Sequence, residues 1–208
     1  MSLPPKPRIE PEADIHSLLE VRWSPRAFTD EEISPQTLRP LFEAARWSAS
    51  CFNAQPWNFI ETRRGAEAFD RLLDCLTPNN QSWAKNAALL VLAIARLNFE
   101  NGKPNRHAYY DLGQSVAQLT LEATAAGLGV HQMAGFDAAR ARERFQIPEG
   151  YDPVSTIAIG FPGQPERLPD KLQERELAPR ERSPQRAFLF AEQWGVASPL
   201  TEDPRPKS

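Results

Sequence analysis

The sequence has few cysteines, no long hydrophobic run and no excess of positive charge, and each lack excludes a class of protein. Cys51 and Cys75 form no CxxC pair and lie near no pair of histidines, so neither a zinc site nor a disulfide framework is expected. The longest apolar run, Ala87 to Ala95, is far shorter than the roughly 20 residues that cross a bilayer. The N-terminus has no apolar signal core. The 27 acidic residues against 24 basic ones do not favour nucleic acid as a partner. We therefore expect a cytoplasmic protein with reduced thiols and no nucleic-acid or membrane partner.

What the sequence does contain is the composition of an ordinary globular protein, with 41% hydrophobic and 25% charged residues. Its 20 prolines, about twice the usual share, gather in the first eleven residues and beyond Pro162. No internal repeat or Gly/Ser linker divides the chain. We expect one domain over residues 1–208, with an N-terminal arm over 1–12 and a C-terminal arm over 163–208.

Hydrophobic periodicity predicts helices and strands in irregular order. Helices are expected at about 15–22, 35–48, 66–76 and 105–126, with a short one after Asp137. Strands are expected at about 57–62, 87–95 and 155–161, although periodicity alone leaves a buried helix open at 87–95. The polar, Pro-rich tail after Pro162 is expected to be irregular. Because helices outnumber strands and do not alternate regularly with them, the predicted fold class is α+β.

Two arginine pairs lie near opposite ends of the sequence. A proline prevents a helix over residues 22–26, so an extended path places Arg22, Ser24 and Arg26 on one side. Two guanidinium groups and a hydroxyl suit a phosphate dianion. The alternative is a solvated basic turn paired with nearby glutamates. Arg180 and Arg182 repeat the pattern, and they add weight only if the two ends of the chain meet at one anion.

Residues 47–57, Trp-Ser-Ala-Ser-Cys-Phe-Asn-Ala-Gln-Pro-Trp, join a predicted helix to a predicted strand. Free backbone amides and small polar side chains at such a junction can bind the edge of a flat heteroaromatic ring. Ser50 and Asn53 can both donate and accept, and Phe52, Pro56 and Trp57 can supply apolar walls. The alternative is a capped loop whose amide side chains satisfy the local backbone. The residues alone leave both interpretations open.

The sequence offers no evident catalytic acid, nucleophile or metal-ligand set. The three histidines lack ligand partners at helical spacing, and no GxSxG motif or carboxylate pair stands out. Gly127-Leu-Gly129 follows a helix instead of opening one, so it is not a dinucleotide fingerprint. Any chemistry is therefore expected to come from a bound cofactor, with no metal and no catalytic side chain assigned.

Several of these segments together resemble the nitroreductase family. They occur in order between about Ile15 and Pro184: RWSPRAF, SASCFNAQPW, NNQSW, DLGQSVAQLTLEATAAGLG, QMAGFD, IAIGFPG and RERSP. NxQPW together with the upstream RxSxR is the most specific part of the match. The resemblance implies a central mixed or antiparallel sheet flanked by helices, with the C-terminal arm exchanged in an obligate homodimer.

The resemblance also implies two FMN molecules at the dimer interface. The phosphate would be held by Arg22, Ser24, Arg26, Arg180 and Arg182, with the backbone of Trp23. Ser50, Cys51 and Asn53 would reach the pyrimidine side of the ring from the other subunit, and Asn80 would reach the ring or the ribityl chain from the first. Ala134 and Gly135 would place backbone amides beside the flavin N5 and O4.

The activity that the resemblance implies is hydride transfer from NAD(P)H through the flavin to an electron-poor acceptor such as a nitroaromatic or a quinone. The sequence departs from the family pattern at three places. Trp83 and Ala134 stand where family members often carry a basic residue and a carboxylate, and Cys51 replaces a more usual serine with a weaker hydrogen-bond donor. The alternatives are a related FMN enzyme, for example one of reductive dehalogenation or flavin fragmentation, and a flavin-binding sensor without turnover.

Overall fold

The centre of the molecule is a four-stranded sheet in the order β1-β2-β4-β3. The computed structural model describes residues 10–202, so parts of both predicted arms, residues 1–9 and 203–208, lie outside the described residues. Every neighbouring pair of strands in this sheet is antiparallel. The strands are β1 (Trp57–Arg63), β2 (Leu89–Arg96), β3 (Gly129–Met133) and β4 (Tyr151–Gly160).

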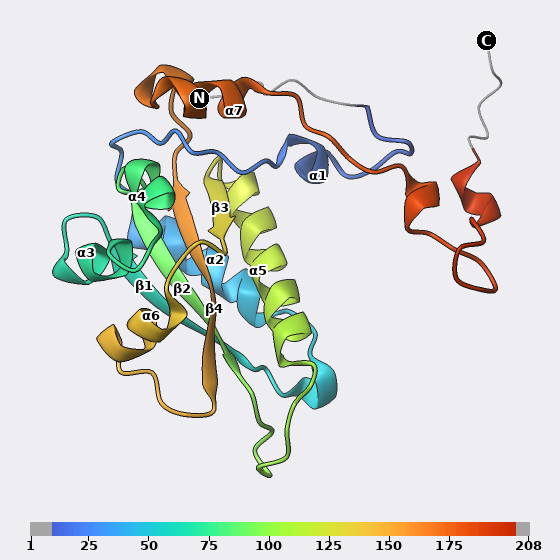
Figure 1. The fold of residues 1–208 in the computed structure, drawn as a ribbon, viewed down its shortest axis with the longest axis horizontal. Coiled ribbons are helices and arrows are strands. Elements are labelled where there is room, and N and C mark those ends of the chain that lie inside the picture. Colours follow the sequence, from blue (N-terminus) through green and yellow to red (C-terminus); the bar gives the residue numbers. More distant parts are fainter. Residues whose placement is uncertain (1–9, 203–208) are drawn as a thin grey trace.

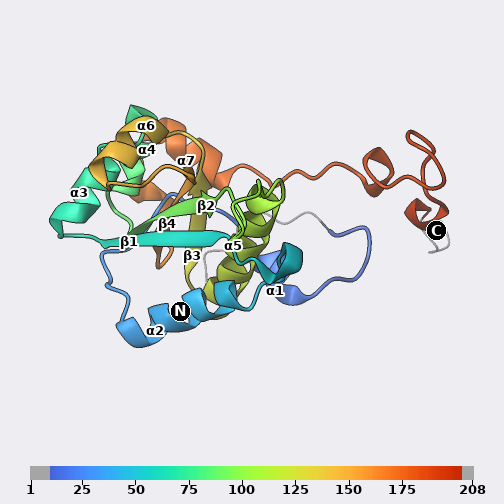
Figure 2. The same ribbon diagram turned by 90° about the horizontal axis from the view of Figure 1, so that it is seen from below.

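Helices cover both faces of the sheet, which gives three layers (Figure 1, Figure 2). Side chains of β2 alternate between the faces: Leu90 and Leu92 pack with the α3, α4, α6 and α7 layer, whereas Val91 packs with α2 and α5. Both sides of this strand are therefore buried, as its continuous apolar run predicts. The helices are α1 (Ser17–Val21), α2 (Pro35–Arg46), α3 (Glu67–Leu73), α4 (Pro78–Ala84), α5 (Ala108–Ala125), α6 (Ala138–Arg144) and α7 (Asp170–Leu177).

Local capping explains where several helices begin and end. The Ser34 hydroxyl accepts a hydrogen bond from the Thr37 amide at the start of α2. The Asp137 carboxylate does the same for the Arg140 amide at the start of α6. After α5, Gly127 takes φ +75°, a conformation that glycine adopts without strain. The antiparallel sheet and the helices around it confirm the predicted α+β class.

Three elements differ from the sequence-based expectation. The tail after Pro162 is not wholly irregular, because α7 forms in it over a run of strong helix formers, DKLQEREL. Prolines bound this helix without interrupting it. The other two elements, α4 and β3, were not expected. Five residues that include a glycine, a histidine and a glutamine carry too little alternation to mark β3 as a strand.

The outer edge of β3 is covered by the segment that contains the first arginine pair. The His131 ring nitrogen Nδ1 lies 3.0 Å from the Pro25 carbonyl oxygen. A Cβ on Gly129 would lie 2.3 Å from Cγ of Pro25, so only glycine permits this close approach. Phe28 forms an isolated bridge with Pro162 and anchors the far end of the segment. The edge strand thus fixes the path of residues 22–28.

Candidate functional site

Three arginines from the two ends of the chain meet in space. The Arg180 guanidinium donates to the Arg22 carbonyl oxygen at 2.9 Å, and the Arg22 guanidinium lies 3.5 Å from the Ser24 hydroxyl. The pKa of Arg22 is lowered from its ordinary value, first because burial removes water from the guanidinium and second because Arg182 and Arg180 are close. Like charges gathered in this way attract an anion. We call Arg22, Ser24, Arg180 and Arg182 the arginine cluster.

Arg26 is placed differently from the rest of its motif. Its guanidinium Nη1 lies 3.6 Å from Oε2 of Glu176, whose side chain is only 1% exposed. Oε1 of the same carboxylate accepts hydrogen bonds from the amides of Arg26 and Ala27 at 2.7 and 3.1 Å. The basic segment is therefore paired, but with a buried carboxylate of α7 and not with the neighbouring glutamates that the alternative interpretation named. Trp23, which lies between Arg22 and Ser24 in the sequence, is buried.

Asn80 and Gly135 form a second group of predicted site residues. The Asn80 amide nitrogen donates to the Gly135 carbonyl oxygen at 3.1 Å, and the Thr77 amide donates to the same oxygen at 2.9 Å. A Cβ on Gly135 would lie 2.7 Å from the Asn80 amide nitrogen. Ala134, immediately before, is exposed. This turn follows β3 directly, so β3 connects the turn to the segment that leads into the arginine cluster.

The loop at Ser50–Gln55 forms the third group. Its Cys51 amide donates to the carboxylate of Asp111, a buried residue in the first turn of α5, at 3.1 Å. The Ser50 hydroxyl accepts from the Gln55 amide, and the Gln55 side chain donates to the Asn53 carbonyl oxygen. Local capping therefore occurs, as one of the two interpretations of this loop predicted.

The same loop also stores backbone strain. Phe52, Asn53 and Gln55 have φ values of 51°, 55° and 47°, in the left-handed region that non-glycine residues rarely adopt. Such residues cost about 1–3 kcal/mol each and cluster at functional sites. Phe52 is 91% exposed, and its ring contacts Phe99 edge-on at a centroid distance of 6.1 Å. Strain together with an exposed aromatic ring favours a binding role in addition to the capping.

Within one subunit, the loop lies far from the segment that leads into the arginine cluster. The loop is attached to the N-terminal turn of α5, whereas the segment at 22–28 lies on Gly129, just beyond the C-terminal end of that helix. The 18 residues of α5 span roughly 27 Å at 1.5 Å per residue. The two regions lie at opposite ends of α5 (Figure 1). A site that used all three groups would need two subunits.

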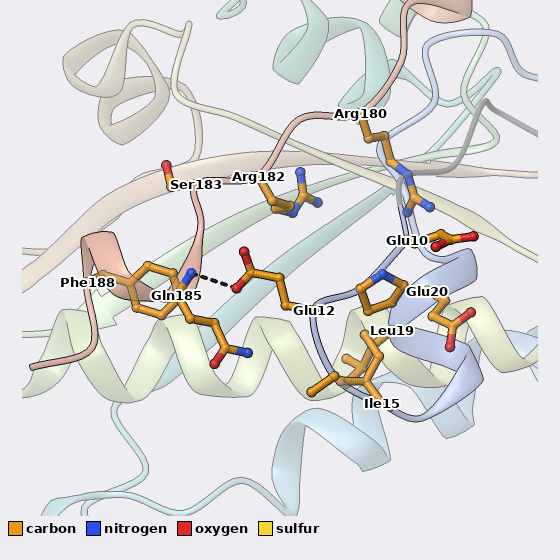
Figure 3. Close-up of a pocket in the computed structure, with 12 residues that line it drawn as sticks. Glu10, Glu12, Ile15, Leu19, Glu20, Arg180, Arg182, Ser183, Gln185 and Phe188 are labelled. Carbon is orange, nitrogen blue, oxygen red and sulfur yellow. Dashed lines mark hydrogen bonds between the residues drawn. The ribbon is translucent and has the colours of Figure 1, made fainter. Parts of the chain in front are cut away.

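A pocket of about 370 Å³ adjoins the arginine cluster (Figure 3). Arg180 and Arg182 line it together with carboxylates of the N-terminal segment, and its apolar side includes Leu19 and Phe188. The backbone amide of Gln185 donates a hydrogen bond to the Glu12 carboxylate across the pocket at 2.9 Å. The pocket lies between the two ends of the chain, so their relative position determines its shape.

Two buried carboxylates escaped sequence reasoning. Asp111 and Glu176 each accept hydrogen bonds from the backbone amides of a predicted binding segment. The pattern that could have indicated Glu176 is its spacing of four from Leu172, which puts a charge on the apolar face of α7. The sequence excluded His131 as a metal ligand but did not indicate its contact; its ring packs on Trp83 at a centroid distance of 4.6 Å.

Among residues 10–202, no group of three or more His, Cys, Asp or Glu side chains is placed to hold a metal ion. Over the same residues, no helix combines the length and the apolarity needed to cross a membrane.

The fold is that of an α+β protein with a cluster of arginines beside the edge of an antiparallel sheet. The family model named "Nitroreductase family" matches residues 19–80 and 62–161, and the chain belongs to that family. The expectation of a central sheet flanked by helices, drawn from the resemblance, is thereby confirmed.

Several individual proteins are similar to most of this chain. An uncharacterized 15.4 kDa protein of Mycolicibacterium smegmatis is 36% identical over 145 residues, which cover 66% of this chain and 97% of that protein. A protein of Streptomyces coelicolor named "Putative NADH dehydrogenase/NAD(P)H nitroreductase" is 27% identical over 197 residues, 83% of this chain and 96% of its own. A crystal structure described as an oxidoreductase containing FMN superposes with a TM-score of 0.83 at 31% identity, over 90% of this chain and 96% of that one.

Proposed function

We propose that this chain is an FMN-dependent oxidoreductase that uses NAD(P)H to reduce an electron-poor acceptor such as a nitroaromatic or a quinone. Membership of the nitroreductase family and likeness to an oxidoreductase containing FMN support the class. The observation that carries the proposal is the arginine cluster, because it brings Arg22, Arg180 and Arg182 close together from the two ends of the chain.

The cluster fits the terminal phosphate of FMN. Arg22 is partly desolvated by burial and repelled by two like charges, so a dianion would relieve both costs. Guanidinium groups hold phosphate oxygens in a planar, two-pronged geometry, and the Ser24 hydroxyl adds a donor. Arg26 would contribute mainly through its backbone position, because its side chain faces Glu176.

The turn after β3 fits the polar edge of a flavin ring. Asn80 is held against Gly135, and the exposed Ala134 leaves the backbone of this turn accessible. We propose that the ring lies here and that Ser50, Cys51 and Asn53 reach it from a second subunit, since their own loop is at the far end of α5. An obligate homodimer follows from this assignment.

Bound FMN would supply the redox chemistry by accepting a hydride and passing it on. The chain's own residues would hold the phosphate, orient the ring and exclude water. Trp83 is fully buried and packs on His131, so the position where family members often carry a basic side chain offers no charge to a nicotinamide cofactor. This observation favours, as a second candidate, a flavin-binding sensor without turnover.

One experiment tests the proposal and separates the two candidates. The purified protein should be yellow and release FMN, not FAD, on denaturation. Under anaerobic conditions NADH or NADPH should bleach it rapidly, and a nitroaromatic or quinone should restore the colour. Colourless protein that cannot be reconstituted with FMN contradicts flavin binding. A yellow protein that neither donor bleaches contradicts the enzyme and favours the sensor.

A further inference from the structure

Glu176 stands out among the buried polar residues because it joins the two ends of the chain. It lies in the last turn of α7, four residues before Arg180. Its side chain is 1% exposed, yet its contacts are with residues 150 positions away: the Arg26 and Ala27 amides at Oε1 and the Arg26 guanidinium at Oε2. The N-terminal arginine motif is thus attached to the helix that leads into the C-terminal one.

A buried carboxylate at position 176 is not explained by hydrophobic packing alone. Leu172, one turn earlier on the same face of α7, is buried in the core cluster that includes Phe28. An apolar residue at 176 would continue that face without the cost of burying a charge. The carboxylate instead satisfies two backbone amides that have no strand partner at the point where residues 22–28 turn past β3.

The position of these contacts determines where the arginine cluster forms. Phe28 fixes the segment on one side of Glu176, through its bridge to Pro162. On the other side, Arg22 and Ser24 lie only four and two residues from Arg26. Within the cluster, Arg180 joins the two ends of the chain by donating a hydrogen bond to the Arg22 carbonyl oxygen. Moving the Glu176 attachment would separate Arg22 from Arg180 and Arg182.

We propose that Glu176 is a positioning residue for phosphate recognition, a statement that rests on the proposed binding of FMN. It does not touch the phosphate. It holds the backbone at Arg26 and Ala27 so that guanidinium groups from both chain ends face one anion. Its loss should therefore weaken recognition of the phosphate and leave recognition of the flavin ring intact.

The experiment compares FMN with riboflavin, which has the same ring and lacks the phosphate. Full-length wild type, Glu176→Ala, Glu176→Gln and Leu172→Ala are stripped of flavin and titrated with each compound by flavin fluorescence. Thermal midpoints are measured alongside. The Leu172→Ala variant is the matched control, because it loosens the same face of α7 but keeps the carboxylate.

In Glu176→Ala, the preference for FMN over riboflavin should fall roughly tenfold or more, as expected when a charged hydrogen-bonding contact is lost. Riboflavin affinity should stay within about threefold, because the ring site is untouched. Glu176→Gln keeps one acceptor oxygen for the amides, so its preference should lie between those of Glu176→Ala and wild type. Leu172→Ala should lower the thermal midpoint and leave the preference unchanged.

Several outcomes overturn the inference. Equal weakening of FMN and riboflavin binding in Glu176→Ala overturns it, because a purely structural residue would have that effect. A gain in FMN affinity would mean that Glu176 competes with phosphate for Arg26. If Glu176→Ala does not fold, an unchanged preference in Glu176→Gln overturns it. In all these cases wild type still prefers FMN and the proposed function stands. A wild type without that preference removes the proposed phosphate site and this inference together.

Discussion

At the scale of single residues, the arginine cluster is a set of repelling charges that folding holds close together. Arg22 and Arg182 come from opposite ends of the sequence, and their proximity lowers the pKa of Arg22 after the larger effect of burial. Such a site loses free energy when it is empty and regains it when an anion binds. The cost of deleting one arginine should therefore appear in ligand affinity more than in the stability of the free protein.

We predict that Arg22→Ala and Arg182→Ala each weaken FMN binding by about 1.5–3 kcal/mol, the usual value of a hydrogen bond to a charged group. Equilibrium titration with FMN measures the loss, and titration with riboflavin should show little change. Arg39→Ala serves as the control, because Arg39 is exposed on α2 in another part of the molecule. Unchanged FMN affinity in both cluster variants would remove the phosphate assignment.

A second residue-scale prediction concerns Gly135 and Asn80. In Gly135→Ala the new Cβ would meet the Asn80 amide nitrogen at 2.7 Å and the Thr77 hydroxyl at 3.1 Å. Asn80 must then move, so we expect FMN and riboflavin to weaken together, by about 1–3 kcal/mol. Asn80→Ala should also weaken both flavins. Because the two residues are in contact, the double variant should lose less than the sum of the single losses; strict additivity would contradict the coupling.

At the scale of elements, β3 is the short strand on which the site depends. It supports the segment at 22–28 along its edge and leads directly into the turn at Gly135. Gly129 permits the first of these contacts, because Cγ of Pro25 occupies the space where a Cβ would be. The packing of the Pro25 ring against Gly129 thus helps to set the distance between the sheet and the arginine cluster.

We predict that Gly129→Ala displaces the segment at 22–28, at a cost of about 1–3 kcal/mol in stability, with weaker FMN binding. Thermal unfolding and FMN titration check the two effects. Gly65→Ala is the matched control, since Gly65 has φ +87° with open space around it. It should lower stability through backbone strain alone and leave FMN affinity unchanged. Normal FMN binding by Gly129→Ala would show that the segment tolerates displacement.

Elements differ in how far the sequence could predict them. The helix that Ser34 caps and the doubly buried β2 follow from local rules, because capping and periodicity act within a few residues. β3 could not be predicted, since its pairing with β4 and its cover by Pro25 are long-range contacts. α7 was missed because the prolines around it outweighed its own helix formers.

The candidate site was predictable in part. Spacing indicated the arginine pairs and the polar loop, and the resemblance assigned them to FMN. Glu176 and Asp111 were not found, because a lone carboxylate in a helix does not reveal which distant amides it will accept from. The meeting of Arg22 with Arg180 likewise depends on the path of the whole chain around the sheet. The sequence therefore indicates which residues could bind a ligand, whereas their arrangement in space depends on the tertiary structure.

At the scale of the whole molecule, the C-terminal arm carries large apolar side chains that a single subunit leaves exposed. Beyond α7 it runs away from the sheet and its helices (Figure 1, Figure 2). Phe188 and Leu200 are 64% and 80% exposed, and Trp194 is 91% exposed, contacting Phe190 at a ring-centroid distance of 5.0 Å. Exposed apolar side chains on an extended arm are typical of a contact surface for another chain.

We predict that this arm stabilises a homodimer and, through it, the flavin site. Trp194→Ala removes a side chain that a lone subunit scarcely buries, so it should not affect stability unless a partner covers it. If one does, each large apolar side chain contributes roughly 1.5–3 kcal/mol, and the variant should shift from dimer toward monomer. Gln193→Ala, which changes an exposed polar neighbour, should leave the dimer unchanged.

Truncation after Pro184 spares Arg180 and Arg182 but removes the contact of Gln185 with Glu12 beside them. FMN loss through the interface is therefore judged from Trp194→Ala, which keeps that contact. Light scattering with flavin absorbance measures both effects, and a truncated protein that remains a yellow dimer would exclude the arm from the interface.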